Sequence, residues 1–318
     1  MARSVWRAIA HGSDCDQGDA VDPRRAGGGA ASALRVGQPG GEGQVYIGAL
    51  AATLAALGLG DLPLAVHLPL VVLAGFVGGA VWGAIPGWLK ARLHLNELIT
   101  TIMLSYIAFW VVSYLVHGPM KDPGGGGYPW SVQVPDSARL PLILKKYRIN
   151  LGSLLALASA AAAHFLLWKT AFGFEMRAVG AGPLAARLAG INAERTTMLT
   201  FAIGGGLAGM AGMAEIVGVQ FRLSDFFSPG YGWDAIVVAM AGQSNPVGVV
   251  LMGLFFGALR NGAESAARSI DMPSSISLII QALALLFIIG SNSVVLYRRL
   301  RRRRVSHAGD SASAVLLD

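Results

Sequence analysis

Polar side chains interrupt or flank several apolar segments of this chain, and they are its first candidates for chemistry. Polar groups are costly at membrane depth, so they tend to face a cavity. Transporter sites are built from broken helices with polar ends, and amide or hydroxyl groups there suit a neutral, hydroxyl-bearing ligand. The candidate pathway residues are Glu42, Gln44, Asn96, Glu97, Thr100, Thr101, Gln243 and Asn245.

A structural role is the competing interpretation for three of these residues. Asn96 and Glu97 stand where a helix would begin, so they are also suited to capping that helix at the membrane surface. Asn245 directly precedes Pro246, the arrangement of a cap followed by the first helical residue. Both interpretations stay open at the level of sequence.

Enzymatic and metal chemistry have little support. No nucleophile is paired with a base in a recognisable motif, and no GxxxxGK[ST] phosphate-binding loop of the Walker type occurs. The single cysteine, Cys15, excludes an internal disulfide and a cysteine-based metal cluster. The six histidines lack a metal-binding spacing such as HExxH. We therefore expect no catalytic residue, cofactor or metal site.

The composition predicts the elements that position these residues. The 318 residues are 54% hydrophobic and only 14% charged, whereas soluble domains carry about 25% charged residues. Several uncharged runs reach the roughly 20 residues that cross a bilayer, and two are too short. We predict an all-α, polytopic transmembrane bundle with seven or eight apolar segments, some short or broken. The segments are 45–59, 66–89, 98–116, 150–168, 196–219, 233–242, 246–263 and 276–297.

The distribution of basic residues predicts the orientation. The net charge of +7 owes much to the RRLRRRR run at 298–304, which follows the last apolar segment and indicates a membrane anchor more than nucleic-acid binding. With Lys90, Arg92 and the basic loop 169–195, it places the 301–318 tail in the cytoplasm. For successive segments to alternate between the two sides of the membrane, 233–242 must cross the membrane at least partly. This orientation leaves the basic residues at 145–148 on the extracytoplasmic side.

Glycines at helical spacing predict close helix packing. Small residues four apart line one helix face and let a second backbone approach. Such pairs occur in three of the apolar segments. They are Gly75, Gly79, Gly83 and Gly87; Gly205 and Gly209; and Gly253 and Gly257.

The basic loop contains a short helix signal. Gly182 precedes Pro183, which fits a first helical turn, and Gly190 can end the helix with a positive φ. Asn192 is placed to cap the next helix. We predict a helix of about two turns along the membrane surface, with Leu184, Ala185, Leu188 and Ala189 on one side and Arg187 directed away. So short a helix needs a partner for that side, either lipid headgroups or a groove on another protein.

Four stretches together carry a family resemblance. The stretch GFEMRAVGAGPLAARLAGINAERTTMLTFAIGGGLAGMAG at 173–212 resembles the cytoplasmic loop and following span of permease subunits of bacterial ABC importers. The branch is the one that includes branched-chain amino acid, ribose and nucleoside permeases. The stretch LNELITTIMLSYIAFWVV at 95–112 resembles its simple sugar/nucleoside members, and 40–50 and 232–263 also match. The resemblance covers a transmembrane permease domain at about 40–300.

The resemblance implies partners and a function. In that family the short helix is the coupling helix, which sits in a cleft of a separate ATP-binding subunit that hydrolyses the ATP. A second related permease and an extracytoplasmic substrate-binding lipoprotein complete the importer in the inner membrane. Nucleosides are the expected substrates; the alternatives are a simple sugar such as ribose, or an ion-coupled secondary transporter. The coupling residues implied are Gly182, Ala185, Ala186, Arg187, Gly190, Ile191 and Asn192.

The first 39 residues differ from this domain. They are rich in Asp, Arg and Gly and lack the apolar core of a signal peptide. Family members usually have further apolar spans before the stretch that matches 40–50. We expect 1–39 to be disordered or non-authentic, as after a frameshift or misplaced start, with N-terminal spans missing. A genuine disordered tail is the alternative.

Overall fold

A computed structural model describes residues 41–60, 62–144, 149–242 and 245–269, together with 279, 282, 283, 286 and 287. Several predictions fall outside these residues: the character of 1–39, the pathway role of Gln243, most of the apolar segment 276–297 and the tail 301–318.

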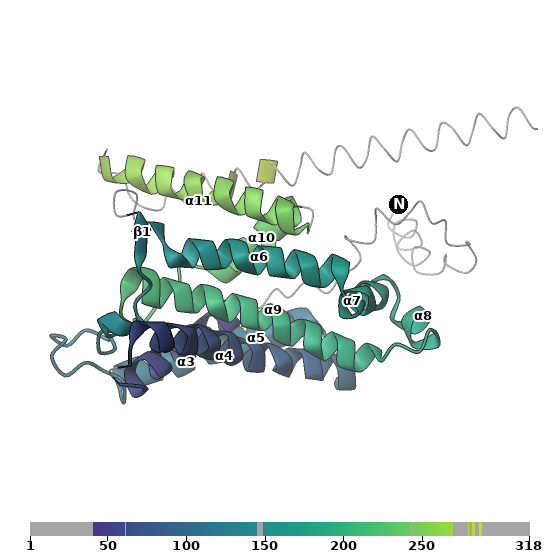
Figure 1. Ribbon diagram of the computed structural model, residues 1–318, viewed down its shortest axis with the longest axis horizontal. Helices are drawn as coiled ribbons and strands as arrows, with labels where there is room; N and C mark the ends of the chain where they lie inside the picture. The colour runs from purple at the N-terminus through teal and green to yellow at the C-terminus, as the bar shows by residue number, and fades with distance from the viewer. Residues whose placement is uncertain are drawn as a thin grey trace, which may run out of the picture.

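The described chain is built from helices, as predicted (Figure 1). Five of the described helices are long and apolar enough to cross a membrane: α4, α5, α6, α9 with its extension to Gln220, and α11 over Pro246–Ala263. The α-helices are α3 (Gly41–Gly58), α4 (Leu64–Leu93), α5 (Glu97–His117), α6 (Leu151–Lys169), α7 (Ala171–Ala181), α8 (Pro183–Leu188), α9 (Ala193–Glu215), α10 (Tyr231–Ala241) and α11 (Pro246–Ser269).

Glycine contacts join α4 to α9 at the centre of the bundle. A β-carbon added to Gly79 would fall on the carbonyl oxygen of Gly205, and one added to Gly209 would fall on that of Gly75. At Gly83 it would lie 2.6 Å from the carbonyl oxygen of Phe201. The two backbones therefore touch directly, which confirms the packing predicted for these glycines.

The short helix α3 lies in this core. Gly48 meets the backbone of Gly209, and Gly78 of α4 lies against Ala51. Val45, Ala49 and most of the other residues of α3 are buried. The sequence predicted a segment too short to span the membrane, and the structure makes that segment the most enclosed helix described. Leu54 is the exception among its side chains, with half of its surface exposed.

Two sequence predictions need correction. Gly257 has no atom within 4 Å of an added β-carbon among the described residues, and Gly253 has only a Val238 methyl at 4.0 Å. The tight packing predicted for this pair is therefore wrong within the described part. The region 169–195, predicted from the sequence as a loop with one short helix, contains a second helix, α7. Thr170 caps α7 by accepting a hydrogen bond from the Gly173 amide (3.0 Å).

The connection between α5 and α6 covers the end of the bundle opposite α7 and α8 (Figure 1). It contains the 3-10 turn Asp136–Ala138 and a small antiparallel pair, β1 (Leu142–Leu144) with β2 (Ile149–Asn150). Backbone hydrogen bonds join Ser131 to Leu223 (2.8 Å) and Leu140 to Val217 (3.1 Å). The latter reaches the π-helix Ile216–Gln220 that extends α9.

The helices α10 and α11 form an antiparallel hairpin. Gly242, at the end of α10, packs on Val249 of α11, with an added β-carbon 2.7 Å from that amide nitrogen. Further along, Arg260 donates to Asp234 at 3.1 Å. The 11-residue α10 is half a span, as the sequence predicted.

We predict that Gly79→Val lowers the free energy of unfolding by about 1–3 kcal/mol or more, because a branched side chain forces α4 off α9. The measurement is the thermal transition of the purified protein in detergent. Gly58→Val is the matched control, since Gly58 has no atom within 4 Å of an added β-carbon. Equal shifts in both variants would contradict a special role for the α4–α9 contact.

Candidate functional site

The basic residues at the end of α4 and in 169–195 lie at one end of the bundle, which we call the basic end, whereas Lys121, Arg139 and Arg222 lie at the other end. Figure 1 shows α7 and α8 at this end. Arg92, in the last turn of α4, and Arg187 of α8 both pair with Glu194, each at 3.7 Å. The Arg177 guanidinium lies over the Trp168 ring, 4.6 Å from its centroid. Arg92 of α4 and the basic residues of 169–195, which predict the orientation, therefore lie at the same end of the bundle.

The α8 turn has the geometry that the sequence predicted. Gly182 is its extended N-cap, and Pro183 is the first helical residue. Gly190 has φ +82°, a conformation that glycine adopts at little cost. The Asn192 side chain then caps α9 by accepting a hydrogen bond from the Arg195 amide at 3.0 Å.

One side of α8 is attached to the protein. Ala186 is buried with Val179 of α7 and Ala193 of α9, and Ile191 packs at the edge of this cluster. The Ile191 amide also donates to the Ala186 carbonyl at 3.0 Å. These contacts fix the short helix on α7 and α9, so α8 has a defined position despite its length.

The other side of α8 is open among the described residues. Leu184 is 74% exposed and Leu188 85% exposed; Ala185 and Ala189 are exposed as well. These four residues form the side that the sequence predicted to need a partner. Exposed leucines on a surface helix are typical of a docking element, whereas Ala186 serves internal packing.

A hollow of about 400 Å³ lies beside α8, between α7 and the start of α9. Glu175 accepts a hydrogen bond from Thr196 there at 3.3 Å. The residues that line the hollow include Glu175, Gly190, Ile191, Asn192, Arg195 and Thr196. The end of the coupling stretch and α7 therefore share one polar recess.

Three predicted pathway residues are buried on the facing helices α3 and α5, and we call them with Ser105 the polar seam. Glu42, Gln44 and Thr101 are buried, with Glu42 8% exposed. The Gly43 amide donates to the Ser105 hydroxyl at 3.2 Å, and that hydroxyl donates to the Thr101 carbonyl at 2.9 Å. The seam joins the start of α3 to α5.

Glu42 reaches a third helix. Its carboxylate accepts a hydrogen bond of 2.5 Å from the amide of Gly232, the second residue of α10. The Gln44 side chain lies near Gly83 of α4, 3.3 Å from an added β-carbon. The polar seam therefore touches four helices.

The other predicted residues of α5 lie at its start, at the basic end, just before Thr101, whose hydroxyl donates to the Glu97 carbonyl at 2.6 Å. Asn96 accepts a hydrogen bond from the Leu98 amide (2.9 Å) and caps α5. Glu97 pairs with Lys90 at 2.6 Å. The Thr100 hydroxyl donates back to the Asn96 carbonyl at 3.2 Å. This geometry favours the capping interpretation that the sequence had left open.

Asn245 also acts as a cap. Its side chain accepts a hydrogen bond from the Val247 amide at 3.2 Å, directly before Pro246 begins α11. Asn245 is exposed, and no described contact joins it to the polar seam.

Sequence reasoning missed the ion pair between Asp234 and Arg260. The Arg260 guanidinium also lies over the Tyr231 ring, 5.1 Å from its centroid. The signal was available, because Arg260 is a lone charge inside the apolar segment 246–263, and such residues usually mark a function or a specific partner.

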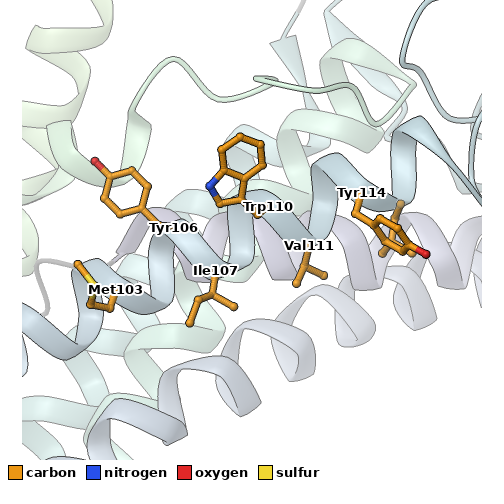
Figure 2. A pocket seen from close by; sticks show the side chains of 7 residues that line it. Met103, Tyr106, Ile107, Trp110, Val111 and Tyr114 are labelled. Atoms are coloured by element: carbon orange, nitrogen blue, oxygen red, sulfur yellow. The ribbon is translucent and has the colours of Figure 1, made fainter.

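An apolar groove of about 510 Å³ runs along α5 on the side away from Thr101 and Ser105. Figure 2 shows Tyr106, Trp110 and Tyr114 four residues apart along the helix. The remaining lining residues are Met103, Ile107, Val111 and Leu115. The groove offers a surface for lipid or another apolar helix.

The long apolar helices, the interrupted α10 and the surface helix α8 together define a multi-pass membrane transport protein. Residues 40–289 match the family model described as the permease component of branched-chain amino acid transport systems, and the chain belongs to this family. It is therefore a permease.

The curated relatives include permeases with different named substrates. The chain is 39% identical over 269 residues to the glucose ABC transporter permease protein TsgB13 of Haloferax volcanii, covering 81% of this chain and 70% of the relative. It is 34% identical over 257 residues to the guanosine ABC transporter permease protein NupP of Bacillus subtilis, covering 80% and 73%. It is 31% identical over 268 residues to the nucleoside ABC transporter permease protein NupB of Lactococcus lactis, covering 81% and 73%. No solved structure matches significantly.

We predict that Glu97→Ala leaves uptake per inserted molecule close to wild type and costs at most about 1 kcal/mol of stability, because its ion pair with Lys90 is partly exposed at a helix end. Uptake by vesicles, normalised to inserted protein, is the measurement. Lys90→Ala and the double variant complete a mutant cycle. A specific fall in normalised uptake would instead place Glu97 on the pathway.

Proposed function

We propose that this chain is the membrane-spanning subunit of an ATP-driven importer of nucleosides. The observation that carries the proposal is the similarity to the guanosine and nucleoside permeases over about four fifths of the chain. A separate ATP-binding subunit would supply the energy, a second related permease would complete the pathway, and an extracytoplasmic lipoprotein would deliver the substrate.

In this proposal α8 is the coupling helix. Ala186 fixes it to α7 and α9, while Leu184 and Leu188 point away from the chain and would enter a cleft on the ATPase. Because α8 is fixed on one side only, a push on its free side is passed to α9 as a rigid-body displacement. The residues assigned to coupling are Gly182, Ala185, Ala186, Arg187, Gly190, Ile191 and Asn192.

The ATPase would bind at the basic end, which therefore faces the cytoplasm. Lys90 and Arg92 at the end of α4, with the basic residues of 169–195, support this orientation. The C-terminal tail then also lies in the cytoplasm. The loop between α5 and α6 would face the delivering lipoprotein.

The substrate pathway would follow the polar seam. Gln44, Thr101 and Ser105 would face it, because buried polar side chains in a membrane protein usually serve transport. The Glu42 carboxylate is instead turned to the Gly232 amide of α10. Amide and hydroxyl groups suit the ribose hydroxyls and base edges of a nucleoside.

A simple sugar is the second candidate substrate, because the relative that is 39% identical is named for glucose. The test is uptake by proteoliposomes containing the assembled importer, with labelled guanosine and labelled glucose measured side by side. ATP-dependent guanosine uptake that excess glucose does not reduce is the expected result. Uptake of glucose without uptake of guanosine would identify a sugar as the substrate. Uptake of either compound without ATP would contradict the proposal of an ATP-driven importer.

We predict that Gly190→Pro abolishes uptake and releases the ATPase while the protein stays in the membrane. Proline cannot adopt the φ of +82° and lacks the amide that donates to the Arg187 carbonyl at 3.0 Å. Co-purification of the ATPase and uptake per inserted molecule are the measurements. Gly190→Asn is the matched control, because asparagine tolerates a positive φ and keeps the amide.

Arg187→Glu tests the same surface by charge. It replaces the attraction to Glu194 by repulsion and changes the charge presented to the ATPase; we expect the same loss of coupling. Normal uptake with bound ATPase in both Gly190→Pro and Arg187→Glu would refute the coupling role of 182–192.

A further inference from the structure

The residues next to the start of the half-span α10 do not cap all of its first amides. Its N-cap residue, Gly230, has no side chain and adopts φ +97°. The first amides of a helix have no intrahelical partner, and inside a membrane each unsatisfied amide costs several kcal/mol. The start of α10 therefore depends on groups from elsewhere.

Each amide of the first turn has an identified acceptor. Tyr231 donates to the Ser228 hydroxyl at 3.2 Å. Trp233 and Asp234 both donate to the Gly230 carbonyl at 3.0 Å. The remaining amide, that of Gly232, donates to Glu42. A side chain from α3, 190 residues away in sequence, thus completes the cap of α10.

The contact between the two helix starts leaves no room for adjustment. A β-carbon added to Gly232 would lie 2.5 Å from the α-carbon of Glu42 and 2.7 Å from its carboxylate oxygen. A β-carbon added to Gly41 would lie 3.6 Å from the Gly232 carbonyl oxygen. Glu42 itself lies in the first turn of α3. The Glu42 side chain therefore lies at the starts of both α3 and α10.

Glu42 is also one of the few links between the α10–α11 hairpin and the core. The α3 start is held to α5 through Gly43 and Ser105, whereas α11 is largely exposed in the described structure. On its far side, the α10 start is held to α11 by the Asp234–Arg260 ion pair. A change at Glu42 would therefore alter the position of the hairpin and leave the α4–α9 contact in place.

We infer that Glu42 is a positioning residue of the transport cycle: it caps α10 from α3 and fixes the broken helix on the core, rather than contacting the substrate. The inference rests on the proposed function for its consequence in transport. The capping itself concerns only this chain and can be measured without a substrate. A carbonyl oxygen suffices for the cap, so a glutamine at this position should serve.

The test compares Glu42→Ala with Glu42→Gln in the assembled importer, with Asp136→Ala in the exposed opposite loop as the acidic control. Amide hydrogen exchange reports the first turn of α10, and labelled guanosine reports uptake. For Glu42→Ala we expect faster exchange at 231–235, unchanged exchange in α4 and α9, and uptake lower by about tenfold or more, since a buried hydrogen bond to a charged group is lost. Glu42→Gln should stay close to wild type in both measurements, and Asp136→Ala should stay close to wild type in the exchange at 231–235.

Three results would overturn the inference. Equal uptake in Glu42→Gln and Glu42→Ala would make the charge itself essential, as in an ion-coupled or substrate-binding role. Exchange at 231–235 could stay unchanged in Glu42→Ala, or α4 and α9 could exchange faster to the same extent, which would indicate general destabilisation. Absence of guanosine uptake in the unsubstituted protein would instead count against the proposed function, and the exchange measurement would still decide the capping.

Discussion

The direct backbone contact between α4 and α9 is the constraint on which the rest of the bundle depends. Helices in a bilayer gain little from burying apolar side chains, because lipid is equally apolar, so association relies on close packing. Gly79 and Gly205 remove the side chains that would separate the two helices. The short helix α3 can then lie against both, with Gly48 on the α9 backbone. Everything else is attached to this three-helix unit.

The second constraint is that polar groups within the bundle must find partners inside the protein. The start of α3 meets this requirement by contributing to three neighbours: Ser105 of α5 receives an amide hydrogen bond, Gly83 of α4 lies beside Gln44, and Gly232 of α10 is capped by Glu42. A half-length helix can begin among apolar helices only because another element completes its cap. The interruption before α10 and the acidic residue at the start of α3 are therefore two parts of one arrangement.

Local features could be predicted from the sequence, and long-range pairings could not. The turn at Gly190 and the cap at Asn192 follow from residues within a few positions of each other. The pairing of Glu42 with Gly232 spans 190 residues, and no single-chain pattern specifies it. The spacing of Gly253 and Gly257 equals that of Gly75 and Gly79, yet only the latter pair is packed, because periodicity identifies a face and not its partner.

The helix that follows α8 also gives the molecule a long mechanical connection. From Ala193 to Gln220 the chain is helical for 28 residues, about 42 Å at 1.5 Å per residue. The glycine contacts hold the middle of α9 against α4. At its far end, the π-helical turn is hydrogen-bonded to the connection between α5 and α6 through the carbonyls of Val217 and Gly218. A displacement imposed on the start of α9 would thus reach that connection through one continuous helix.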